Sequence, residues 1–177
     1  MKAFPTRIRT ASDLATFHFA WFGIVWGAAH SQGWLVMAST SGHLLLHAAL
    51  APSLRREALY ALMAGTAGWA IDTLLGLVGI FHFATALAPA WLWCLWVVFA
   101  STLDPGFRWF RSRSLLAGAL GLVSGPFSYE VGVRLGALSW GRGHLLGWIA
   151  LGGIWAMALP LLLAARSKWD ARSDLRT

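Results

Sequence analysis

The sequence predicts an all-α polytopic membrane protein with six transmembrane helices and both termini in the cytoplasm. The first observation is composition: 58% of the 177 residues are hydrophobic and only 12% are charged. A soluble domain usually has about 45–50% apolar and about 25% charged residues, so this chain has too little polar surface to cover a water-soluble globule. The twelve tryptophans agree, because indole rings favour the membrane–water interface.

The second observation is that apolar segments of suitable length recur along the whole chain. A helix that spans a bilayer needs roughly 17–25 predominantly apolar residues. Six segments fit or approach this length, and connections rich in turn-forming residues separate them. In chain order the predicted helices cover residues 14–31, 33–51, 57–82, 88–103, 114–138 and 143–165.

The third observation is the distribution of positive charge. Twelve of the fourteen Lys and Arg residues lie in the two terminal segments and in the second and fourth connections. Arg142 lies in the fifth connection, and Arg134 lies within a predicted helix. Because cytoplasmic loops are enriched in Lys and Arg, this alternation predicts cytoplasmic segments at residues 1–13 and 166–177. Anionic lipid at that surface explains the net charge of +7, so we expect no nucleic acid as a partner.

Asp72 places a carboxylate in the middle of the third predicted helix. An ionised Asp at the centre of a spanning helix costs roughly 2.5–3.5 kcal/mol on insertion scales, so it should be paired or face the bundle interior. Ala64, Gly68 and Gly76 share its helix face, and small residues allow a neighbouring helix to approach closely. The sequence therefore predicts that Asp72 lies in a seam between helices.

Other polar residues are predicted near the depth of Asp72. His43 and Glu130 lie at similar distances from the outer ends of their helices, and at about 1.5 Å per residue the three fall within roughly 3 Å of one depth. Neighbouring polar or aromatic positions on these helices are His47, Thr40, Ser128, Tyr129, Arg134 and Trp96. We interpret the set as a polar pocket, with helix packing alone as the alternative. Glu130 and Arg134 also have the spacing of a local ion pair.

Motifs for metal or cofactor chemistry are weak. His43 and His47 lie one turn apart, and two imidazoles on one face can share a metal ion. However, Leu44 stands where the His-Glu-x-x-His zinc motif has its glutamate. Cys94 is the only cysteine, which excludes an internal disulfide and a multi-cysteine metal site. We expect no metal and no cofactor.

The order and spacing of several motifs resemble the bacterial integral-membrane family numbered 2878 among the domains of unknown function. These motifs are FHFAWF, IDTLLGL, PAWLWCLWVVFASTL, FRWF, GPFSYEVGVRLGA and ALPLLL, and they span about residues 14–165. The resemblance implies a multi-pass protein of the bacterial inner membrane, from a kind of family whose genes often lie near those of fatty-acid-modifying enzymes. It matches Asp72 and Tyr129 to the family's acid and its helix-5 tyrosine. Asp104-Pro105 and Glu130 depart from the family pattern, and the first argues against a shared catalytic histidine there.

Three functions remain open from the sequence. The first is binding or processing of a membrane lipid, a fatty-acyl amphiphile or another hydrophobic small molecule. As an enzyme, the protein would use Asp72, His43 and Tyr129 as catalytic residues, with the ligand bound by His47, Ser128, Glu130, Arg134, Thr40 and Trp96. The second is a small proton-coupled transporter, which would need a homo-oligomer because no internal repeat is visible. The third is a non-catalytic subunit or assembly factor with a membrane partner. We favour the first, because the polar groups gather at one depth.

Overall fold

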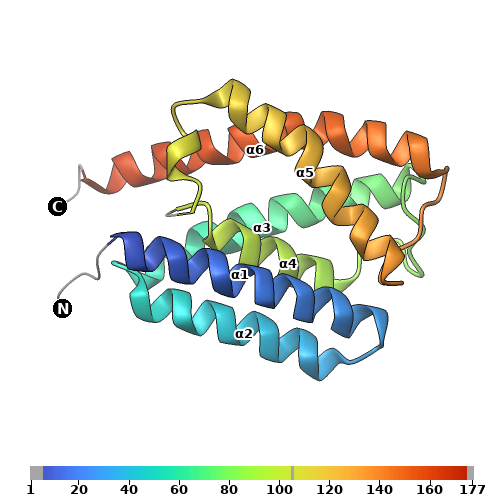
Figure 1. The fold of residues 1–177 in the computed structure, drawn as a ribbon, viewed down its shortest axis with the longest axis horizontal. Coiled ribbons are helices and arrows are strands. Elements are labelled where there is room, and N and C mark those ends of the chain that lie inside the picture. The colour runs from blue at the N-terminus through green and yellow to red at the C-terminus, as the bar shows by residue number, and fades with distance from the viewer. Residues whose placement is uncertain (1–5, 105, 175–177) are drawn as a thin grey trace.

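The computed structural model describes residues 6–104 and 106–174, with side chains for residues 8–104 and 106–171. In this part of the chain there are six α-helices and one short 3-10 helix, which confirms the all-α class and the six predicted helices. The elements are α1 (Thr6–Ala29), α2 (Gly33–Leu50), α3 (Leu54–Leu77), α4 (Ala90–Ser101), η1 (Arg108–Phe110), α5 (Ser114–Arg134) and α6 (His144–Asp174). The start of α1 and the end of α6 lie at the same end of the bundle (Figure 1).

The helices pack as three sequential hairpins, α1 with α2, α3 with α4, and α5 with α6. α4 also packs against α1 and α2, while α5 runs obliquely across α6 (Figure 1). Small residues allow close approach at these crossings. A Cβ atom at Gly65 would lie 2.6 Å from the side chain of Val97, and one at Gly121 would lie 2.2 Å from the carbonyl oxygen of Trp155. Glycine is therefore required where α3 meets α4 and where α5 meets α6.

Several helix bounds differ from the predicted ones: α1 begins at Thr6 and not at residue 14, and α5 ends at Arg134 and not at residue 138. Two further ends differ for identifiable reasons. α3 ends at Leu77, before the predicted end at residue 82, because Gly79 adopts a φ of +77° and the Ile80 amide turns back to the Leu75 carbonyl. α6 continues beyond the predicted end at residue 165 to Asp174. Ion pairs that Arg166 makes with Glu57 of α3 and with Asp104 of the α4–α5 connection hold this last part of α6 against the bundle.

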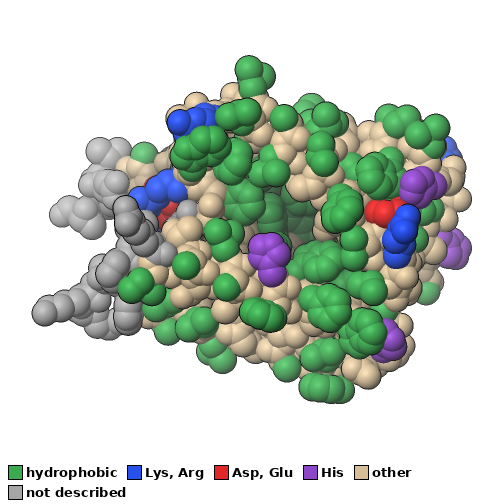
Figure 2. All heavy atoms as spheres, viewed as in Figure 1, with side chains coloured by type: hydrophobic (Ala, Val, Ile, Leu, Met, Phe, Trp, Pro, Cys, Tyr) green, Lys and Arg blue, Asp and Glu red, His purple; other side chains and the backbone are tan. Residues whose placement is uncertain are grey.

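Two described helices are long and apolar enough to cross a membrane, Leu54–Leu77 and His144–Ala171. This is a weak indication of membrane association, and α4 is apolar but shorter. Large hydrophobic side chains such as Phe19, Trp34 and Leu115 are at least 70% exposed, and Figure 2 shows hydrophobic side chains spread over one whole face. Six membrane crossings and their orientation stay predictions.

Candidate functional site

Asp72 lies where α3, α4 and α5 meet, and its carboxylate accepts hydrogen bonds from two aromatic side chains. The indole nitrogen of Trp96 donates to Oδ2 at 2.7 Å, and the hydroxyl of Tyr129 donates to Oδ1 at 2.7 Å. Asp72 is only 1% exposed. Gly68, one turn earlier, makes room for this arrangement, because a Cβ atom there would lie 2.2 Å from the Trp96 ring. The prediction that Asp72 lies in a seam between helices is confirmed.

Stacked rings hold both donors in place. Trp96 stacks on Trp155 of α6 with 4.9 Å between ring centroids and 8° between planes. Tyr129 stacks on Phe81, from the α3–α4 connection, with 5.2 Å between centroids and 16° between planes. Because each ring packs against a neighbouring ring, the stacking restricts its rotation and keeps both donors directed at the carboxylate. Asp72, Trp96 and Tyr129 are named here the Asp72 cluster.

A cavity of about 420 Å³ lies beside the Asp72 cluster, between α1, α4, α5 and α6. Trp96 and Tyr129 line it, whereas Asp72 does not. Figure 2 shows the hollow, walled by hydrophobic side chains, with a histidine at its edge. The volume falls in the range of roughly 300–1,000 Å³ that is typical of small-molecule sites. Other residues that line it are Phe17, His18, Trp21, Phe99, Ser124, Ser128 and Trp155.

Ser128 belongs to this cavity, and Thr40 does not. The indole nitrogen of Trp21 on α1 donates to Ser128 Oγ on α5 at 3.1 Å, so the pair joins two walls of the cavity. The Thr40 hydroxyl donates instead to the carbonyl of Val36 in its own helix at 2.8 Å. Of the sequence-predicted ligand-binding residues, Ser128 and Trp96 therefore line the cavity together with Tyr129.

His43 and His47 lie in other hydrogen-bond groups. His43 Nδ1 is 2.9 Å from the Thr16 hydroxyl, and its Nε2 is 2.9 Å from the Ser101 hydroxyl. His47 Nδ1 is 3.1 Å from Oδ1 of Asp13. The two imidazole rings are 6.2 Å apart, and each has separate partners. The structure therefore does not bring either histidine into contact with the Asp72 cluster.

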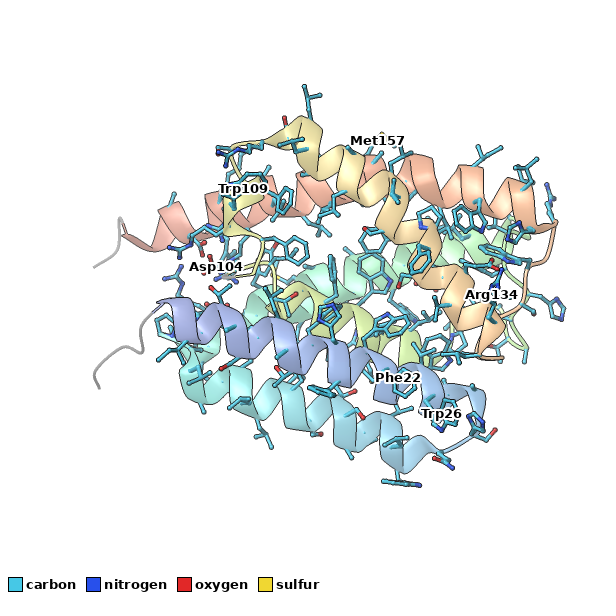
Figure 3. All side chains as sticks on the ribbon, in the orientation of Figure 1. Phe22, Trp26, Asp104, Trp109, Arg134 and Met157 are labelled. Carbon is cyan, nitrogen blue, oxygen red and sulfur yellow. The ribbon has the colours of Figure 1, made fainter. Side chains whose placement is uncertain are left out.

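Glu130 and Arg134 form a third polar group near the α5–α6 connection. The predicted local pair is confirmed, with 2.8 Å between Arg134 Nε and Glu130 Oε1. The indole nitrogens of Trp140 and Trp148 donate to Glu130 Oε2 at 3.3 Å, and His144 Nε2 lies 2.9 Å from the same oxygen. Figure 3 shows Arg134 at one end of the bundle, and neither Glu130 nor Arg134 lines the cavity.

A buried ion-pair network at the opposite end of the bundle is not predicted from the sequence. Glu57, at the start of α3, accepts two hydrogen bonds from the guanidinium of Arg166 at 2.7 and 2.8 Å. Arg9 of α1 donates to the same carboxylate at 3.3 Å, and His47 Nε2 lies 3.7 Å from it. This carboxylate therefore connects four helices, α1, α2, α3 and α6.

The same network includes the connection between α4 and α5. Arg111 lies 2.9 Å from a carboxylate oxygen of Asp104 and 2.9 Å from one of Asp170, which joins this connection to α6. Arg108 also pairs with Asp104, and the hydrogen bond that its guanidinium donates to the Asp104 carboxylate raises the pKa of Arg108. Figure 3 shows Asp104 near the end where α1 begins. One feature of the sequence could have indicated this network. Most of the chain's seven acidic residues lie at or near the ends of predicted helices, on the predicted cytoplasmic side, where most of the Lys and Arg residues also lie.

Comparisons with known proteins agree with the motif pattern. No curated protein and no solved structure matched the chain. The family model described as "Protein of unknown function (DUF2878)" matches residues 11–161, which include the Asp72 cluster and most of the six-helix bundle. This match confirms the resemblance inferred from the motifs, and the chain belongs to the DUF2878 family.

Proposed function

We propose that this protein binds a membrane lipid or a fatty-acyl amphiphile in the cavity beside the Asp72 cluster. The observation that supports it is the cavity itself, about 420 Å³ with a wall made mainly of hydrophobic and aromatic side chains. Apolar pockets with a few fixed polar groups are the usual form of small-molecule sites. Ser128 and His18 supply polar atoms to this largely hydrocarbon-lined space, while Trp96 and Tyr129, both held by Asp72, supply fixed aromatic rings.

We further propose that the protein crosses the bacterial inner membrane six times with both termini in the cytoplasm. The exposed hydrophobic side chains support a lipid environment, because water would not favour them. The end of the bundle that contains Arg9, Arg111 and Arg166 fits the cytoplasmic side, where positive residues concentrate. The cavity then faces the hydrocarbon layer, from which an amphiphile can enter sideways.

Asp72 acts in this proposal as a positioning residue. It does not line the cavity, and both of its oxygen atoms are used by Trp96 and Tyr129. A ligand therefore meets the rings and not the carboxylate. This arrangement favours binding over direct proton transfer by Asp72, and any processing reaction would have to use groups that reach the cavity.

Native mass spectrometry of the protein released in a gentle detergent tests the proposal. The variant Ser124→Trp places a large side chain at a residue that lines the cavity. The matched control is Val123→Trp, which adds the same indole at the next position on α5, where the side chain is 65% exposed and does not line the cavity.

We expect a discrete bound lipid mass in the wild type and in the Val123→Trp control, and its loss in Ser124→Trp. Thermal unfolding of the three proteins checks that all remain folded. A wild type without bound lipid, or a Ser124→Trp variant that keeps the same lipid, would contradict binding in this cavity.

A further inference from the structure

We propose that the ligand ends in an uncharged O–H group, as in a long-chain alcohol or a protonated fatty acid, and that His18 and Ser128 recognise this group. The inference rests on the proposed function of the cavity and names the chemistry of its occupant. Both residues line the cavity, His18 from α1 and Ser128 from α5.

The backbone contact of His18 determines which ring nitrogen carries hydrogen in the neutral side chain. His18 Nδ1 lies 2.6 Å from the carbonyl oxygen of Leu14. A carbonyl oxygen only accepts hydrogen bonds, so Nδ1 must donate, and Nε2 of the neutral ring is left with a lone pair. His18 is exposed and lines the cavity, so this lone pair is an acceptor available to a ligand.

The Ser128 hydroxyl offers the complementary donor. Its oxygen already accepts a hydrogen bond from the indole of Trp21 at 3.1 Å. Among the described residues, the hydroxyl hydrogen of Ser128 has no acceptor. Trp21 lies one turn after His18 on α1, so its bond to Ser128 brings the serine to the part of the cavity next to the histidine. The cavity therefore presents one acceptor and one donor.

The remaining wall disfavours an anionic headgroup. No Lys, Arg, Asp or Glu is among the cavity-lining residues in the part of the chain that the structure describes. A phosphate or an ionised carboxylate would enter an apolar site without a counter-charge, which is costly. An ester or an ether can accept from Ser128 but cannot donate to His18. A terminal O–H group satisfies both residues and carries no charge.

Competition between 1-hexadecanol and its methyl ether tests this inference, because the ether keeps the chain and the oxygen acceptor but lacks the donor hydrogen. Binding is measured by native mass spectrometry of the full chain. The variant His18→Phe removes the acceptor. Its matched control is His30→Phe, since His30 directly follows the same helix, makes the same kind of bond to the carbonyl of Trp26, and does not line the cavity.

We expect the wild type and His30→Phe to prefer the alcohol by about threefold to tenfold, the effect of one hydrogen bond, and His18→Phe to bind both molecules equally. Ser128→Ala should weaken the binding of the alcohol and of the ether to the same extent. Equal binding of both by the wild type, or a preference that persists in His18→Phe, would overturn the O–H inference and leave the cavity proposal standing. Binding of neither molecule would overturn both.

Hexadecanoic acid separates the two sources of the O–H group. Burial in an apolar site raises the pKa of a carboxylic acid, so uptake of its protonated form falls as the pH rises. If hexadecanoic acid displaces the alcohol at pH 7 and not at pH 9, the carboxylic acid is the group recognised. If the alcohol keeps the site at both pH values, the site is specific for a hydroxyl. Both results support recognition of an uncharged O–H group, and better competition by the acid at pH 9 would contradict it.

Discussion

The carboxylate of Asp72 shows how a polar side chain can be accommodated among hydrocarbon without a cation. Its two oxygens each receive one strong donor, the Trp96 indole and the Tyr129 hydroxyl, both at 2.7 Å. The sequence predicts the seam and the closeness of the small residues, because helical spacing alone determines which positions share a face. It does not predict Trp96 as a direct partner, because the pairing depends on how far α4 is shifted along α3.

Replacement of Asp72 by Asn tests the role of this acceptor. The amide keeps one acceptor oxygen but turns a donor towards either Trp96 or Tyr129, so one buried donor loses its partner. We expect the free energy of unfolding to fall by about 1–3 kcal/mol. Tyr129→Phe leaves Oδ1 of the buried carboxylate without its donor, so its effect should be of similar size. Thermal unfolding in detergent measures both, and an Asp72→Asn protein as stable as the wild type would refute the assignment.

Arg166 is the residue on which the ion-pair network depends most. Arg166 is only 2% exposed, and its guanidinium donates two hydrogen bonds to the carboxylate of the buried Glu57. Arg166→Gln leaves that carboxylate without its bidentate partner, and breaking a buried pair in this way costs about 3–5 kcal/mol. The matched control is Arg134→Gln, because that side chain is 77% exposed and should leave the unfolding midpoint close to the wild-type value. Similar midpoints for the two variants would contradict the structural importance of the network.

At the scale of the elements, close helix contacts are set by glycines, and helix ends are set by contacts distant in sequence. The sequence predicts six helices well because long apolar runs need no tertiary information. The end of α6 could not be predicted in this way. Residues 166–171 are predicted from the sequence to belong to a polar tail. In the structure, Arg166 and Asp170 pair with residues of α3 and the α4–α5 connection. Such pairings are visible only once the helices are packed.

Gly68→Ala tests the close approach of α3 and α4. The added methyl group would lie 2.2 Å from the Trp96 ring, so either the ring or the helix must shift. We expect a loss of about 1–3 kcal/mol, as for other overpacked sites, with weaker lipid retention because Trp96 lines the cavity. Gly42→Ala on α2 is the control, since nothing lies within 4 Å of an added Cβ atom there. If the two variants unfold at the same temperature, the seam is looser than described.

At the scale of the whole molecule, three polar groups lie in different parts of one apolar bundle. The ion-pair network, which includes Asp104, and the Glu130 group, which includes Arg134, lie near opposite ends (Figure 3). The Asp72 cluster and its cavity lie between the helices. The positions of His43, Asp72 and Glu130 along their helices predict that the three lie at one depth. Their partners could not be predicted, because depth along a helix does not fix the direction in which each side chain points. The cavity could not be predicted either, because its walls come from four helices.

Labelling of single cysteines tests the proposed orientation. The only native cysteine, Cys94, is buried and gives little background. Thr85 and Ser112 are exposed residues in the α3–α4 and α4–α5 connections. We expect an impermeant maleimide to label Thr85→Cys in intact spheroplasts and to label Ser112→Cys only after the membrane is opened. Labelling of Ser112→Cys from outside would reverse the proposed orientation.

The most direct test of the lipid-binding proposal is an experimental structure of the protein purified from its own membrane with lipid retained. Lipid binding at this site predicts elongated density in the cavity between α1 and α5, in contact with Trp96 and Tyr129, with its polar end near His18 and Ser128. A cavity filled by rearranged side chains, or lipid density found only on the outer surface of the bundle, would contradict it.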